Sequence, residues 1–93
     1  MSEYDKLAEL FKIFGDATRV RILFSIKNDE KSVSDIVGEL NISQSAVSHQ
    51  LNTLRMSRLV KVRKHGKSVF YSINDEHVNE ILSCGLDHIS EVI

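Results

Sequence analysis

The stretch that decides the fold is SVSDIVGELNISQSAVSHQLNTLRM, residues 32–56. It contains two segments in which apolar residues recur every three or four positions, a spacing that places them on one face of a helix. The apolar positions are Val33, Ile36, Val37 and Leu40 in the first segment and Val47, Leu51 and Leu54 in the second. Ser32 can cap the first helix, with Asp35 as its capping-box partner. The sequence therefore predicts two short helices joined by a tight turn at residues 41–43, the second helix covering residues 43–55.

The periodicity changes after Leu59. Val60 and Val62 alternate with basic residues, and a second alternating run covers residues 69–73, so this segment predicts two β-strands. Between the strands, Lys64-His65-Gly66-Lys67-Ser68 is the expected tip of a hairpin. Two helices with a tight turn, followed by a hairpin, are the order of a winged helix-turn-helix.

Two further amphipathic helices are expected on the N-terminal side of this motif. The first contains Leu7, Leu10, Phe11 and Phe14 at helical spacing and stops near Gly15. The second follows the capping residue Asp16 and has its apolar positions between Val20 and Ile26. A polar loop over residues 27–31 ends it.

A long terminal helix is expected over about residues 75–92, with Asn74 as its N-cap. Its apolar positions are Val78, Ile81, Leu82, Ile89, Val92 and Ile93. So long a stripe in so small a chain favours a dimer interface, and we expect a homodimer formed through the first and last helices. The fold class is therefore mainly α with a β-hairpin wing, a single winged helix-turn-helix domain over residues 1–93. Its helix-turn-helix, wing and C-terminal helix are expected at about residues 32–56, 59–73 and 75–92.

The composition indicates an ordered, soluble protein. Of 93 residues, 42% are hydrophobic and 27% are charged, with mixed signs. A single cysteine excludes an internal disulfide and suits a reducing compartment. No apolar run approaches the length of a membrane span, and no signal segment opens the chain. We therefore expect a cytoplasmic protein with no membrane partner.

The net charge of -1 hides a strong segregation along the chain. No Asp or Glu occurs from Leu40 through Asn74, whereas the basic residues Arg55, Arg58, Lys61, Arg63, Lys64 and Lys67 all lie in that window. A basic region of this kind predicts contact with a phosphate backbone. A solvated basic surface is the alternative, but it rarely accompanies so long a stretch without acids.

Double-stranded DNA is therefore the expected partner, with the second helix of the motif in the major groove. The candidate contacts on this helix are Ser43, Gln44, Ser45, Ser48, His49, Asn52 and Arg55, and those on the wing are Arg63, Lys64, His65 and Lys67. Small polar residues on a helix often face only solvent. Between a tight turn and a basic wing, however, they favour contacts with bases and phosphates.

The terminal helix carries two pairs of side chains that can bind metal, Asp75 with His77 and His88 with Glu91. His77 and His88 are eleven residues apart, a rise of roughly 16 Å, so one ion cannot reach both within a straight helix. Two such helices paired antiparallel about a two-fold axis would bring the pairs together, because a single register places Asp75 near the partner copy's Glu91 and His77 near its His88. Two imidazoles and two carboxylates suit Zn(II), with Co(II) or Ni(II) also possible.

The central residues of that register, Ser83, Cys84 and Gly85, are small and would allow close approach of two helices. Cys84 is expected to be a buried packing residue rather than a ligand. For any single one of the four proposed ligands, a solvated helix face would be the simpler interpretation. The shared register favours a metal site.

The chain resembles the ArsR/SmtB family of prokaryotic metal-responsive repressors over nearly its whole length. The resemblance lies in FKIFGDATRVRIL at residues 11–23, in SQSAVSHQL at residues 43–51 and in the wing. Many members have proline where this chain has Ala17, a change that should leave the fold intact. The Asp-x-His and His-x-x-Glu pairs look like the family's zinc site, which bridges two subunits. Members that sense arsenic, cadmium or lead carry cysteines where residues 32–38 have none, so that site is not implied here.

The resemblance implies a dimer that binds an imperfect inverted repeat without metal and releases it when metal binds. It also points to the backbone near Arg58 as the place where a ring nitrogen of His88 would transmit metal binding. One alternative is a winged-helix DNA-binding regulator without metal response, controlled by redox chemistry at Cys84 or by a protein partner. An enzyme is not expected, because no nucleophile or general base accompanies the proposed ligands.

Overall fold

The computed structural model describes residues 1–92. In chain order its elements are α1 (Glu3–Phe14), α2 (Ala17–Ser25), α3 (Val33–Leu40), α4 (Gln44–Met56), β1 (Val60–His65), β2 (Ser68–Ile73) and α5 (Glu76–Val92). This order confirms the winged helix-turn-helix expected from the sequence. Ile93 and the side chain of Val92 lie outside the described part of the chain, and with them the end of the expected apolar stripe.

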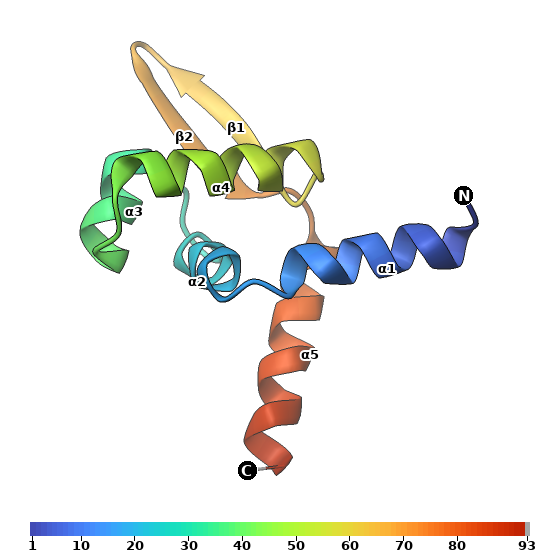
Figure 1. Cartoon of the computed structure of the whole chain (residues 1–93). Helices are drawn as coiled ribbons and strands as arrows, with labels where there is room; N and C mark the ends of the chain where they lie inside the picture. The colour runs from blue at the N-terminus through green and yellow to red at the C-terminus, as the bar shows by residue number, and fades with distance from the viewer. Residues whose placement is uncertain (93) are drawn as a thin grey trace.

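The core lies where α2, α3 and α4 pack against one another, beneath α4 (Figure 1). Its completely enclosed side chains are Ile22, Leu23, Ile26, Ile36, Val47, Leu51 and Leu54. The three inward positions expected on α4 are all among them. Because α4 uses this one face for packing, its opposite face is left to solvent.

Local hydrogen bonds fix the turn between α3 and α4. Ser32 and Asp35 form the expected capping box, with the Ser32 hydroxyl accepting from the Asp35 backbone N–H at 3.1 Å and the Asp35 carboxylate accepting from the Ser32 N–H at 3.0 Å. Asn41 ends α3 in the left-handed region at φ 56°, which asparagine tolerates. Ser43 then caps α4 by accepting from the Ala46 N–H at 3.1 Å.

The wing is an antiparallel pair in which Val60 faces Ile73 and His65 faces Ser68. Its turn is therefore Gly66-Lys67, shorter than the tip expected from the sequence. Gly66 has φ 62°, and two-residue hairpin turns favour glycine because they need a positive φ there. Two backbone hydrogen bonds of 2.8 and 3.0 Å between Lys31 and Tyr71 attach β2 to the segment before α3. The wing is thus anchored to the helix-turn-helix.

Helix α4 ends in a Schellman motif, although the sequence has no glycine at this position. The Leu59 N–H donates to the Leu54 carbonyl at 3.0 Å, and the Arg58 N–H donates to the Arg55 carbonyl at 3.0 Å. Arg58 has φ 61°, in the left-handed region where glycine is the usual residue. A non-glycine residue there costs roughly 1 kcal/mol.

Replacing Arg58 by glycine is expected to raise the free energy of unfolding by less than about 1 kcal/mol, because the left-handed conformation costs glycine no steric strain. Equilibrium urea unfolding of the two proteins measures the change. The gain is reduced by the larger chain entropy of glycine in the unfolded state. A loss of stability would show that the side-chain contacts of Arg58 and the added chain entropy of glycine together outweigh the backbone strain at this position.

The structure corrects two expectations about α5, one about its N-cap and one about its apolar residues. Asp75, rather than Asn74, caps the helix: its Oδ1 accepts from the Val78 N–H at 3.2 Å. Val78 and Leu82, expected in the dimer interface, are buried in the chain's own core instead. The apolar stripe is therefore divided, because its first turns cover this domain and only later residues remain free.

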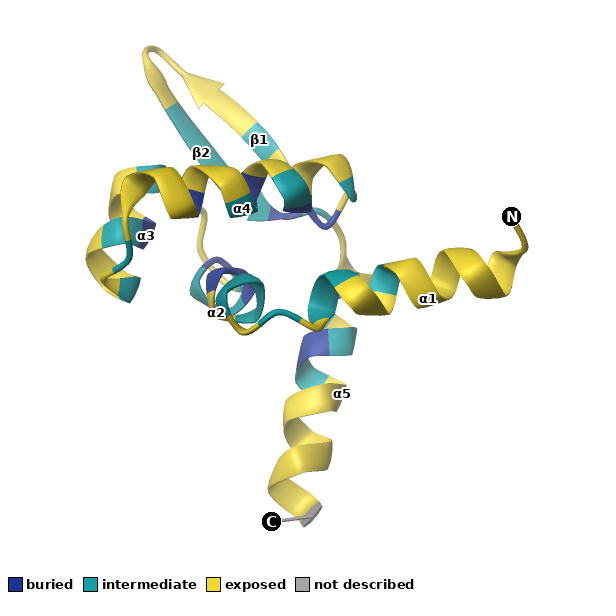
Figure 2. Ribbon diagram, viewed as in Figure 1, coloured by how far each residue is buried: buried dark blue, intermediate teal, exposed yellow. Residues whose placement is uncertain are grey.

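Helices α1 and α5 extend away from the core in different directions (Figure 1). No residue of α1 is buried, and α5 is exposed beyond its first turns (Figure 2). The exposed large apolar residues of these two helices are Tyr4, Leu7, Phe11, Leu86 and Ile89. Within residues 1–92, no helix combines the length and the hydropathy that crossing a bilayer would need.

Candidate DNA interface and metal-binding face

The outward face of α4 carries the expected base contacts. Ser43, Gln44, Ser45, Ser48, His49, Asn52 and Arg55 are all exposed. The Ser43 hydroxyl caps the helix and lies 3.3 Å from the Ser45 hydroxyl. By contrast, the side chains of Gln44, Ser48 and Asn52 make no hydrogen bond within residues 1–92. Their donors and acceptors are free to meet the edges of bases.

The wing lies beside α4 and projects on the side of the molecule opposite to α5 (Figure 1). Lys64, His65 and Lys67 are exposed at its tip. Since no acid occurs between Leu40 and Asn74, the charged residues that α4 and the wing contribute to this region are all basic. Such a region attracts a polyanion that is wide enough to touch both elements.

Arg63, an expected DNA contact, is already engaged within the chain. Its Nη2 and Nε donate to the two carboxylate oxygens of Glu30 at 2.6 and 3.1 Å, and its guanidinium lies 5.1 Å from the centroid of the Phe70 ring. The hydrogen bond from Arg63 lowers the pKa of Glu30 below its ordinary value of 4.5. At neutral pH the pair is therefore charged, and Glu30 competes with phosphate for Arg63.

Replacing Glu30 by glutamine is expected to free Arg63 for a phosphate and so to strengthen DNA binding at low salt. The slope of log affinity against log salt should become steeper by about 0.9, the value for one additional phosphate contact. Fluorescence anisotropy across a salt series measures this slope. Glu39→Gln is the matched control, because it removes the same charge from a pair with Lys31, 3.0 Å apart, outside the wing. Equal slopes for the two variants would show that Glu30 does not restrain Arg63.

The four expected metal ligands lie at the two ends of α5. At its start, Asp75 Oδ1 is 3.5 Å from His77 Nδ1, and the His77 side chain is 87% exposed. His88 and Glu91 are exposed near the other end. Within residues 1–92 of one chain, no group of three or more His, Cys, Asp or Glu side chains is placed to hold a metal ion. The two pairs remain apart, as their spacing along one helix requires.

The ligand pairs face away from the core of the chain. At about 100° per residue, His77, His88 and Glu91 fall within roughly 60° of one another around the α5 axis. Their face is about 130° from the one through which Val78 and Leu82 enter the core. Cys84 lies on the ligand face and is exposed in the single chain, so the burial expected for it would need a second copy.

Sequence reasoning missed the Glu30–Arg63 pair and the left-handed Arg58. The first joins residues 33 positions apart in the chain, and no local pattern encodes such a distance. The second has one weak signal, the abrupt change from helical to alternating periodicity after Leu59, which shows that the helix must end just before that residue.

Comparison with known proteins places the chain among regulators. The family model described as "Bacterial regulatory protein, arsR family" matches residues 16–62, about half of the chain. A transcriptional repressor SmtB homolog from Synechocystis sp. is 37% identical over 91 residues, which are 98% of this chain and 69% of that protein. The uncharacterized HTH-type transcriptional regulator MJ1325 of Methanocaldococcus jannaschii is 45% identical over 83 residues, 88% of this chain and 93% of that protein.

Among solved structures, the crystal structure of M. tuberculosis Rv0081 superimposes with a TM-score of 0.91 at 28% identity, covering 99% of this chain and 93% of that one. The likeness thus extends from the helix-turn-helix through α1 and α5. Together, the matched family model, the relatives and the shared fold confirm the resemblance drawn from the sequence: this chain belongs to the arsR family of bacterial regulatory proteins.

Proposed function

We propose that this transcriptional regulator is a homodimeric repressor that binds operator DNA and releases it when Zn(II) occupies sites shared between its two α5 helices. Co(II) and Ni(II) fit the same donor set. Its family consists of regulatory proteins, and the chain is not an enzyme. A regulator of this kind would act in the cytoplasm, where operator DNA is accessible.

The observation that carries DNA binding is the joined surface of α4 and the wing. Ser48 and Asn52 have free polar groups on the exposed face of α4, which would enter the major groove. Lys64, His65 and Lys67 would reach the flanking phosphates or the minor groove. Each half of a dimer would then occupy one half-site of an inverted repeat.

Dimer formation is supported by the apolar residues that the single chain leaves exposed. Leu86 and Ile89 on α5 are 52% and 53% exposed, and Leu7 and Phe11 on α1 are about equally so. These residues lie on the two helices that protrude from the core. Burying them against a second copy would remove apolar surface from water, which favours association.

The metal site is supported by the chemistry of its donors and by their position. Asp75 and His77 are already adjacent, and both oxygens of the Asp75 carboxylate keep lone pairs beyond the hydrogen bonds they accept. His88 and Glu91 lie on the same exposed face of α5. Two imidazoles and two carboxylates can hold Zn(II) in tetrahedral geometry. When bound, the ion would supply a link between the two subunits, and the four side chains would orient it.

DNA-binding anisotropy of the wild type and of His77→Ala, with and without a series of divalent metals, tests the proposal. A duplex enriched from a random pool by the wild type serves as the probe, at one fixed salt concentration. We expect zinc to weaken DNA binding by the wild type by about 5-fold to 150-fold, the usual range of allosteric coupling. His77→Ala should bind the same duplex and ignore zinc.

The same titration separates the alternative function, a winged-helix regulator without metal response. The exposed thiol of Cys84 is the feature that favours redox control. A wild type that binds DNA equally with and without every metal, but differently after oxidation, would establish that alternative. Failure to enrich any duplex would contradict both functions.

A further inference from the structure

Arg19 joins three helices through one guanidinium group. From α2, its Nε donates to the Ile13 carbonyl at 2.9 Å and its Nη2 to the Lys12 carbonyl at 3.4 Å, both in the last turn of α1. Its Nη1 donates to Gln50 Oε1 on α4 at 3.2 Å. The Asp16 carboxylate lies 4.0 Å from Nη1, and the Arg19 side chain is only 19% exposed. Arg19 is therefore a largely buried connection between the first helix and the DNA-facing helix.

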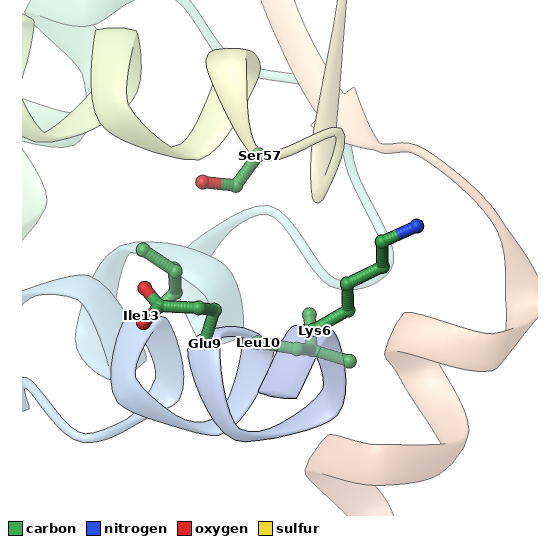
Figure 3. A pocket seen from close by; sticks show the side chains of 5 residues that line it. All are labelled: Lys6, Glu9, Leu10, Ile13 and Ser57. Carbon is green, nitrogen blue, oxygen red and sulfur yellow. The ribbon is translucent and has the colours of Figure 1, made fainter. Parts of the chain in front are cut away.

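The surroundings of Arg19 make this connection important for the placement of α1. Helix α1 packs on α2, and α2 packs on α4. Between α1 and the end of α4, however, lies a cavity of about 330 Å³, lined by Lys6, Glu9, Leu10 and Ile13 of α1 and by Ser57 (Figure 3). Side-chain packing across this gap is incomplete, so it cannot by itself fix the angle between α1 and α4. Within residues 1–92, Arg19 is the residue whose side-chain hydrogen bonds reach both helices.

We propose that Arg19, acting through Gln50, positions α4 relative to the dimer-forming helix α1 and thereby sets the half-site spacing that the dimer accepts on DNA. This inference rests on the proposed function, in which α1 contributes to the dimer and α4 enters the major groove. In such a dimer the distance between the two α4 helices depends on how each α4 is held against the interface. The two α4 helices of the dimer must match half-sites that lie one helical turn of DNA, or a multiple of it, apart.

The chemistry of arginine suits this role. Its planar guanidinium presents donors in a fixed fork, so it can bond two carbonyls of α1 and one side chain of α4 at once. Lysine keeps the charge but has a single flexible ammonium group that cannot reproduce this geometry. Gln50→Ala removes only the bond to α4 and leaves Arg19 in place on α1. Arg19→Lys and Gln50→Ala should therefore loosen the same link from its two ends.

The test compares wild type, Arg19→Lys, Gln50→Ala and the double variant on synthetic duplexes. The reference duplex is one enriched from a random pool by the wild type, and two others have the segment between half-sites lengthened or shortened by one base pair. A fourth carries a base substitution within one half-site. Anisotropy gives the affinity ratio of each duplex to the reference, and analytical ultracentrifugation verifies that every protein is a dimer.

We expect the wild type to lose about tenfold or more in affinity on the altered spacings, a cost similar to that of a mismatched base pair. For each variant this spacing penalty should fall to about threefold or less, and the double variant should add nothing further, because the substitutions break one shared link. The penalty for the base substitution should be the same in all four proteins, since the base-contacting face of α4 is unchanged.

Two outcomes would overturn the inference, and they are distinguishable. If the variants weaken binding to all duplexes by a common factor, Arg19 has a merely structural role and the proposed function stands. If the wild type enriches no duplex, the proposed function fails and the inference fails with it. Should Arg19→Lys not fold, Gln50→Ala alone decides the first question, because it leaves the bonds between Arg19 and α1 intact.

Discussion

Replacing Leu86 by glutamate is expected to convert the dimer to a monomer at micromolar concentration. Leu86 is half-exposed on α5 in the single chain, and in a two-fold symmetric dimer each substitution acts twice. Losing the burial of two leucines and placing two carboxylates at the interface should cost at least about 3 kcal/mol, a hundredfold or more in the dimer dissociation constant. Sedimentation velocity over a concentration series measures the shift.

Loss of the dimer should weaken binding to an inverted repeat much more than binding to an isolated half-site, because the two halves no longer bind as one unit. Met56→Glu is the matched control. Met56 is 78% exposed but lies at the end of α4, outside α1 and α5, so this variant should remain a dimer. If Leu86→Glu also remains a dimer with unchanged dissociation constant, the interface does not include this part of α5.

Replacing His88 by alanine is expected to abolish the effect of zinc on DNA binding while leaving metal-free DNA affinity almost unchanged. His88 is exposed near the C-terminal end of α5, and α5 projects on the side of the molecule opposite to the wing (Figure 1). The whole coupling, about 1–3 kcal/mol, should therefore disappear without a change in the DNA-binding surface. Anisotropy with and without zinc measures both quantities.

Asp87→Asn is the control for this substitution, because Asp87 is also exposed on α5 but does not belong to the proposed ligands. It should keep the zinc response of the wild type. A His88→Ala protein that still releases DNA on zinc binding would exclude the route from α5 to the region of Arg58. Coupling must also be reciprocal, so DNA should weaken zinc binding by the same factor in the wild type.

The fold could be predicted largely because its signals are local. The capping box of Ser32 and Asp35, the inward spacing of Val47, Leu51 and Leu54, and the alternation in the wing each involve residues within one element. The division of the α5 stripe could not be predicted in the same way. Helical periodicity shows that Val78, Leu82 and Ile89 share a face, but it does not show which of them the chain itself covers.

The same distinction between local and long-range signals applies to the candidate site. The exposure of the candidate residues on α4 follows from the spacing of its apolar positions, and the basic character of α4 and the wing follows from the absence of acids between Leu40 and Asn74. The Glu30–Arg63 and Arg19–Gln50 bonds do not, because they join residues 33 and 31 positions apart and arise only from the tertiary packing. The register that would bring the two ligand pairs together differs from both, because it concerns two chains. It follows from helix geometry rather than from contacts within a single chain.

Subunit complementation tests the sharing of each ion between two protomers most directly. In a heterodimer of His77→Ala with His88→Ala, one site loses both histidines, whereas the other combines an intact His77 with an intact His88. With the two proteins carrying different affinity tags, purified heterodimers should bind about one zinc tightly, whereas each variant homodimer should bind none tightly. Competition with a chromophoric chelator measures this stoichiometry. Heterodimers that hold no more zinc than the variant homodimers would contradict a site built from both subunits.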